Sequence, residues 1–242
     1  MGKFTRWIAG GLGWAFFGPV GGILGFVLGS FLENENPASY QTGYKGKTTT
    51  PGDFAVSLLV LVAAVMKADG KVLRSELDYV KEYFVKAFGE SSAGEAIILL
   101  RDLLKQNIDV KAVATQIRSQ LDYASRLQMM HFLFGIANAD GRLHPGELKT
   151  LEMIAGHLGI SMKDHDSIKA MFYNDIDSAF RILEVDRTAT DEEIKKAYRK
   201  MAMKYHPDKV AYLGEDIRKA AHEKFQKVNE SYEKIKKERG IV

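Results

Sequence analysis

The chain has 242 residues and a formal net charge of +3, and 46% of its residues are hydrophobic. This length has room for two small domains and one further segment. The absence of Cys excludes disulfides, thiol catalysis and thiolate metal sites, and it suits a reducing compartment. The sequence also shows no phosphate-binding loop and no nucleophile–base arrangement, so we expect neither enzymatic activity nor a cofactor.

Residues 1–32 are expected to form a membrane anchor that contacts lipid. Residues 7–32 are 26 consecutive positions without a charge, which is long enough to cross a bilayer of about 30 Å as a helix. A secretory signal peptide also begins with basic residues, here Lys3 and Arg6, and an apolar core. The run is long for a signal peptide, and no small-residue cleavage pattern precedes Glu33. We therefore expect a single-pass anchor.

Glycines are unusually frequent in this apolar run. Gly21, Gly25 and Gly29 lie four residues apart and would share one face of a helix. Small residues on such a face let two membrane helices approach closely, which favours a homodimer through the anchor. The alternative explanation is that glycine is simply common in membrane helices.

A linker and then a helical region follow the anchor. Residues 33–52 are rich in Asn, Ser, Thr, Gly and Pro, which predicts a flexible linker. Residues 53–175 show the apolar spacing of amphipathic helices without the alternation typical of strands. Within them, residues 54–66 are strongly apolar, but 13 positions are too few to span a membrane. This segment predicts a buried core helix.

An internal repeat divides the helical region into two related halves. Residues 68–77 read Ala-Asp-Gly-Lys-Val-Leu-Arg-Ser-Glu-Leu, and residues 139–148 read Ala-Asp-Gly-Arg-Leu-His-Pro-Gly-Glu-Leu. Each copy is expected to end one helix at Asp-Gly and to begin the next near Ser75 or Pro145, with glycine allowing the tight turn. The repeat resembles the TerB, or tellurite-resistance, family, which implies an all-helical fold of two related halves.

The same repeat resembles half of a calcium-binding EF-hand. If Asp69 or Asp140 takes loop position five, Glu76 or Glu147 falls at position twelve. Positions one and three then carry apolar, basic or amide side chains in place of carboxylates. We therefore expect both segments to be structural turns without a metal site. If a metal were bound, Asp69, Glu76, Asp140 and Glu147 would be its candidate ligands. The family's link to tellurite and metal stress leaves weak metal binding as the alternative.

A basic amphipathic helix is predicted to begin after Thr190, a suitable N-cap that three acidic residues follow. Its apolar residues recur at spacings of three and four, which predicts one buried stripe. The other face carries Lys195, Lys196, Arg199, Lys200 and Lys204. Pro207 disfavours helical geometry at the residue before it, so the helix should end near His206.

A second apolar stripe predicts a partner helix near the C-terminus. It comprises Ala221, Phe225, Val228, Tyr232 and Ile235. Packing of the two stripes gives an antiparallel helical hairpin with a small core. The sequence Tyr205-His206-Pro207-Asp208-Lys209, with the basic helix before it and this helix after it, resembles the J domain of the DnaJ family. The resemblance covers residues 177–242.

This second resemblance implies docking on a DnaK-type chaperone and stimulation of its ATP hydrolysis. The family's signature maps onto His206, Pro207 and Asp208. The rest of the expected chaperone-binding set is Lys195, Lys196, Arg199, Lys200, Lys204 and Lys209. The alternatives are a merely solvated basic face or one that contacts phosphates. Residues 178–242 contain 16 Lys and Arg against 12 Asp and Glu, a small excess that suits an acidic protein groove better than nucleic acid.

The J-like part also departs from longer DnaJ-type proteins. It is not followed by a Gly/Phe-rich segment, CxxC zinc repeats or a β-rich client domain. The resemblance therefore does not extend to client binding of the usual DnaJ kind. Residues 172–177 are a short connection between the two domains, which should restrict their relative motion.

Together, the expected fold is all-α, with an anchor, a TerB-like domain and a J domain. It resembles membrane-anchored DnaJ-like co-chaperones. We expect the anchor in the inner membrane and both domains in the cytoplasm. Basic residues before the span and acidic residues after it favour the reverse orientation, but that would separate the J domain from an ATP-dependent partner. The alternative function is a TerB-type membrane-stress or metal-responsive interaction protein with a secondary J domain; the intact His206-Pro207-Asp208 favours the co-chaperone.

Overall fold

The computed structural model of the chain describes residues 51–68, 70–173 and 175–240, and every regular element within these ranges is a helix. The first seven are α3 (Pro51–Met66), α4 (Arg74–Phe88), α5 (Glu90–Leu103), α6 (Val110–Gln120), α7 (Tyr123–Ala137), α8 (Pro145–Leu158) and α9 (Met162–Ala170). They are followed by α10 (Ile176–Ile182), α11 (Asp191–Lys204), the 3₁₀ helix η1 (Pro207–Leu213) and α12 (Glu215–Arg239). For the described part of the chain, the prediction of an all-α fold is confirmed.

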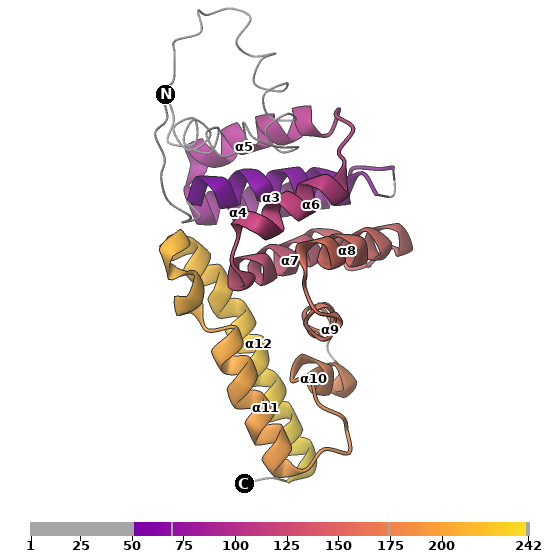
Figure 1. Cartoon of the computed structure of the whole chain (residues 1–242), viewed down its shortest axis with the longest axis vertical. Helices are drawn as coiled ribbons and strands as arrows, with labels where there is room; N and C mark the ends of the chain where they lie inside the picture. Colours follow the sequence, from indigo (N-terminus) through magenta and orange to yellow (C-terminus); the bar gives the residue numbers. More distant parts are fainter. Residues whose placement is uncertain (1–50, 69, 174, 241–242) are drawn as a thin grey trace, which may run out of the picture.

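Helix α3 is the core of the first domain, which comprises α3 to α9 (Figure 1). All residues from Phe54 to Met66 are buried. The helix is apolar around most of its circumference because α5, α6, α7 and α8 all contact it. The prediction of a buried core helix at residues 54–66 is therefore confirmed.

The two repeated segments form equivalent turns, one between α3 and α4 and one between α7 and α8. Gly70 and Gly141 have φ angles of 77° and 82°, a left-handed conformation that glycine adopts at little cost. The following helices begin at Arg74 and at Pro145, close to the predicted positions. The two halves of the domain therefore share one helix–turn–helix pattern.

The C-terminal domain comprises α10, α11, η1 and α12. Helices α11 and α12 run side by side as an antiparallel hairpin (Figure 1). Ile194 and Met201 of α11 are buried, as are Val228 and Ile235 of α12. The rings of Tyr198 and Tyr232 stack with their centroids 4.2 Å apart. The predicted hairpin and both of its apolar stripes are thereby confirmed.

One end of this hairpin lies against the first domain, and the end near the C-terminus points away from it (Figure 1). The 3₁₀ helix η1 contacts α3 and α7, α12 contacts α4, and α10 contacts α9. The turn between α11 and α12 is therefore close to the junction of the two domains.

Candidate functional site

Local capping at Thr190 fixes the start of the basic helix α11. The Thr190 backbone N–H donates to Glu193 Oε2 at 2.8 Å, and the Glu193 N–H donates to Thr190 Oγ1 at 3.3 Å. This reciprocal capping box satisfies two of the unpaired donors at the N-terminus of a helix. The Thr190 hydrogen bonds lower the pKa of the Glu193 carboxyl. The predicted N-cap is confirmed.

Most of the predicted basic residues lie on one exposed face of α11. Lys195, Lys196, Arg199 and Lys200 are all exposed. Lys200 Nζ is 2.9 Å from Glu184 Oε2, so part of its charge is neutralised locally. The face available to a partner is therefore basic but centred on the first two turns of the helix.

The tripeptide His206-Pro207-Asp208 forms the corner between α11 and η1. Pro207 is buried, whereas 49% of the His206 side chain and 71% of the Asp208 side chain are exposed. The Asp208 backbone N–H donates to His206 Nδ1 at 3.3 Å, and the imidazole packs edge-on against Phe225 of α12. The corner is thus held by a buried proline and a neighbouring ring, while an imidazole and a carboxylate face solvent.

Lys204 lies in a different environment from the other basic residues of α11. Its Nζ is 2.6 Å from Glu184 Oε1 and pairs with the Asp164 carboxylate of α9, and only 19% of the side chain is exposed. Burial opposes its charged form, but the hydrogen bonds that Lys204 donates to these two carboxylates raise the pKa of Lys204. The structure therefore corrects the expectation that Lys204 shares the exposed face, because its charge is held in ion pairs at the domain junction. Lys209 is exposed, directly after the tripeptide.

Two further contacts between the domains were not predicted. Tyr212 of η1 donates to the Asp122 carboxylate, and its hydroxyl is 2.7 Å from Ser125 Oγ. Lys224 of α12 is buried and donates to Gln128 Oε1 of α7. Burial lowers the pKa of Lys224 well below its ordinary value. Lys224 lies three residues after Ala221 and four residues before Val228, both in the apolar stripe of α12. This spacing was the one feature of the sequence that indicated its burial.

The repeated glutamates cap helices. Glu76 Oε2 accepts a hydrogen bond from the Leu73 backbone N–H at 2.6 Å, and Glu147 Oε2 accepts one from the His144 N–H at 3.0 Å. Both glutamates are buried at the third position of their helices, as in the glutamate half of a capping box. The equivalent acidic residues of the two repeats therefore have the same local structural role.

The other two metal candidates, Asp69 and Asp140, do not form a metal site within the described residues. Asp140 accepts from the Arg142 backbone N–H at 2.9 Å, which lowers the pKa of its carboxyl. Asp69 lies outside the described residues. Among the residues that the structure describes, no group of three or more His, Asp or Glu side chains is placed to hold a metal ion.

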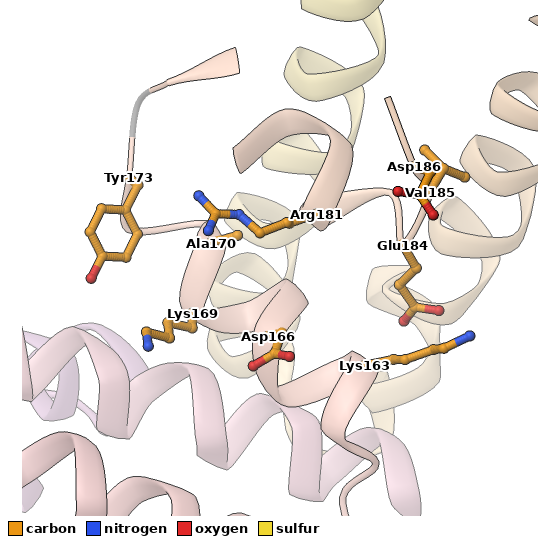
Figure 2. Close-up of a pocket in the computed structure, with 9 residues that line it drawn as sticks. All are labelled: Lys163, Asp166, Lys169, Ala170, Tyr173, Arg181, Glu184, Val185 and Asp186. Carbon is orange, nitrogen blue, oxygen red and sulfur yellow. The ribbon is translucent and has the colours of Figure 1, made fainter. Parts of the chain in front are cut away.

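A cavity of about 700 Å³ lies between α9 and the segment that follows α10 (Figure 2). Its charged lining residues are Lys163, Asp166, Lys169, Arg181, Glu184 and Asp186. Figure 2 shows these side chains spread around the space, with both signs of charge, and not converging on one point. This arrangement does not single out one class of ligand.

The predicted anchor lies in residues 1–50, outside the described ranges. Gly21, Gly25 and Gly29 belong to it, so the membrane span and its self-association stay predictions. Among the helices that the structure does describe, none has the length and apolar character needed to cross a membrane.

Two family models match the chain. Residues 55–170 match the tellurite resistance protein TerB, and residues 178–240 match the DnaJ domain. Over 96% of its length, the chain is 24% identical to the co-chaperone protein DjlA of Coxiella burnetii, of which the match covers 96%. It is 23% identical to the DjlA of Yersinia pseudotuberculosis over 93% of each chain. The chain is a DjlA-like protein of the DnaJ family.

Helices α3–α9 therefore form the TerB domain, and α10–α12 form the J domain. The J-domain likeness is the stronger one locally. The chain is 50% identical to the chaperone protein DnaJ of Fusobacterium nucleatum over 54 residues, which is 22% of this chain and 14% of that protein. No solved structure gives a significant match to the chain.

Proposed function

We propose that the chain is a J-domain co-chaperone that recruits a DnaK-type chaperone and stimulates its ATP hydrolysis. The observation that carries this proposal is the corner at His206 and Asp208, whose side chains are accessible beside an exposed basic helix. The J domain's family implies a partner of this type, and the DjlA relatives are named as co-chaperones. In this reading the ATP chemistry belongs to the partner, and this chain supplies a rigid docking surface.

The exposed charges of α11 suit an acidic groove on that partner. Complementary charges of this kind raise the association rate and are weakened by salt, because exposed ion pairs are screened over about 10 Å at 0.1 M salt. Lys195, Lys196 and Arg199 would contribute most, since Lys200 is paired with Glu184 and Lys204 is held at the domain junction.

Charge reversal tests this docking face. Lys196→Glu combined with Arg199→Glu should weaken binding to the chaperone by at least about tenfold, or about 1.4 kcal/mol, and should flatten its salt dependence. A matched control is Lys237→Glu, which makes the same kind of change at an exposed position of α12. Binding that is insensitive to salt and equal in both variants would show that the α11 face is only solvated.

The membrane position is part of the same proposal. The 26-residue uncharged run at positions 7–32 supports an inner-membrane anchor, with the TerB and J domains on the cytoplasmic side where ATP is available. The native chain should resist extraction from membranes by alkaline carbonate, and a chain lacking residues 1–32 should be released. Protease added to the outer side of the membrane should leave the J domain intact.

Self-association through the anchor is a separate element of the proposal. If Gly21, Gly25 and Gly29 form a close-packed face, Gly25→Leu should separate two anchors while the chain stays in the membrane. Crosslinking in membranes measures this directly. Equal dimer yields for the native chain and the variant would assign the glycines another role.

A further inference from the structure

The end of the J domain that carries His206 lies against the TerB domain. Helix η1, which begins at Pro207, contacts α3 and α7. His206 and Lys209 share a crevice with Ala124 and Leu127 of α7. The space in this crevice is about 10 Å³, no more than a single water molecule needs. One side of the tripeptide therefore adjoins another domain of the same chain.

Polar contacts hold the two domains together on both sides of this corner. They are the Lys204–Asp164 ion pair, the Tyr212–Asp122 hydrogen bond and the Lys224–Gln128 hydrogen bond. Lys204 precedes His206 by two residues, and Tyr212 follows Asp208 by four. Because the contacts flank the tripeptide and all end on α7, on its N-cap residue Asp122 or on α9, they fix how the His206 corner faces the TerB domain.

We infer that the TerB domain restrains the J domain in this arrangement, so that the chaperone docks fully only after the two domains separate. The inference rests on the proposed function and adds regulation to it. A standard protein interface buries about 800 Å² on each partner. Because His206 lines a crevice with Ala124 and Leu127 of α7, a partner surface of this area centred on His206 would reach α7, although water reaches 49% of the His206 side chain and 71% of the Asp208 side chain.

The junction is also built to open at moderate cost. Lys224 buries an ammonium group against an amide oxygen, and among the described residues no carboxylate accepts a hydrogen bond from it. Such burial is unfavourable because hydration of the charge is lost, which agrees with the lowered pKa of Lys224. Separation of the domains would return the ammonium to water, and this hydration would offset part of the free energy lost with the contacts between the domains.

A reversible crosslink tests the inference. Glu82 of α4 and Lys219 of α12 line a cavity of about 310 Å³ between the domains, and the native chain has no Cys. The full chain with Glu82→Cys and Lys219→Cys, in lipid nanodiscs, would be joined by a reducible bifunctional thiol reagent. We expect the joined chain to stimulate the chaperone's ATPase at least about tenfold less than the same chain after reduction. Equal stimulation before and after reduction would overturn the inference.

Two single variants should move the activity in opposite directions. Gln128→Leu removes the acceptor of the Lys224 ammonium and should raise stimulation at limiting co-chaperone by about threefold or more. Lys224→Met removes the buried charge and should lower stimulation by a similar factor. Lys227→Met, at an exposed position of α12, is the matched control. Stimulation that is the same in all three variants would contradict the inference.

The same measurements separate the proposed function from the restraint by the TerB domain. If the reduced double-cysteine chain and the native chain both fail to stimulate the chaperone, the proposed function is wrong and this inference is wrong with it. If both stimulate fully, lose stimulation with His206→Gln, and do not respond to the crosslink, the function stands and the restraint by the TerB domain is wrong.

Discussion

Replacing Lys224 by Met should stabilise the protein, although it removes a hydrogen bond between the two domains. The lysine side chain is 2% exposed, and its ammonium donates to Gln128 Oε1. Relieving a buried, poorly compensated charge by an apolar side chain of similar volume is worth about 1–4 kcal/mol. The amide of Gln128 then loses a donor, which costs about 1 kcal/mol.

The net effect expected for Lys224→Met is a gain of about 2 kcal/mol in the free energy of unfolding. For a chain of this size that corresponds to a rise of about 4–8 °C in Tm. Thermal denaturation of the full chain in a mild detergent measures it. Lys227→Met is the control, because Lys227 forms an exposed ion pair with Glu230 and such pairs contribute little.

The stabilisation should also depend on pH. The pKa of Lys224 in the folded chain is lowered, so the unfolded chain binds more protons between that pKa and the ordinary value of 10.5. The stability of the native chain therefore rises with pH in this range, and its deficit relative to Lys224→Met should shrink as pH rises toward 10.5. A variant that is less stable than the native chain by 1 kcal/mol or more would refute the reasoning about the buried charge.

Three other outcomes follow from the described contacts. Asp69→Asn combined with Asp140→Asn should leave melting in calcium unchanged; a calcium-induced rise in Tm that the double variant loses would overturn the structural interpretation of the repeats. Glu147→Ala should lower the free energy of unfolding by about 1 kcal/mol through loss of a helix cap, whereas Glu147→Gln should cost less, as chemical denaturation would show. Burial lowers the pKa of His131 well below 6.5, so stability should fall as pH drops below 6.5. His131→Gln should reduce that slope, which chemical denaturation at several pH values would measure.

Local patterns in the sequence were sufficient to predict the helical character of the chain and the corner at His206-Pro207-Asp208. The strongly apolar run at 54–66, interrupted only by Ser57, indicated a buried helix, and the acidic first turn after Thr190 marked a helix start. Pro207 ended α11 because its ring restricts the residue before it, and the helix does end at Lys204. These features depend on neighbours within a few residues.

Contacts between distant segments were beyond such patterns. By spacing alone Lys204 belongs with Lys196 and Lys200, but its carboxylate partner Asp164 lies 40 residues earlier on another domain. The sequence gives no local sign of that pairing. Glu76 and Glu147 differ from Lys204, because a glutamate three residues after the N-cap is a local signal of a capping box. The likeness to an EF-hand instead suggested metal ligands at these positions, so the cap was not predicted.

Stimulation of ATP hydrolysis by a purified DnaK-type chaperone tests the central claim most directly. The full native chain should accelerate hydrolysis, and His206→Gln should abolish the acceleration while far-ultraviolet circular dichroism and Tm stay unchanged. The fold should tolerate this change because the His206 side chain is half-exposed at the corner. A folded His206→Gln chain that stimulates the chaperone as well as the native chain does would contradict the assignment of this corner as the docking site.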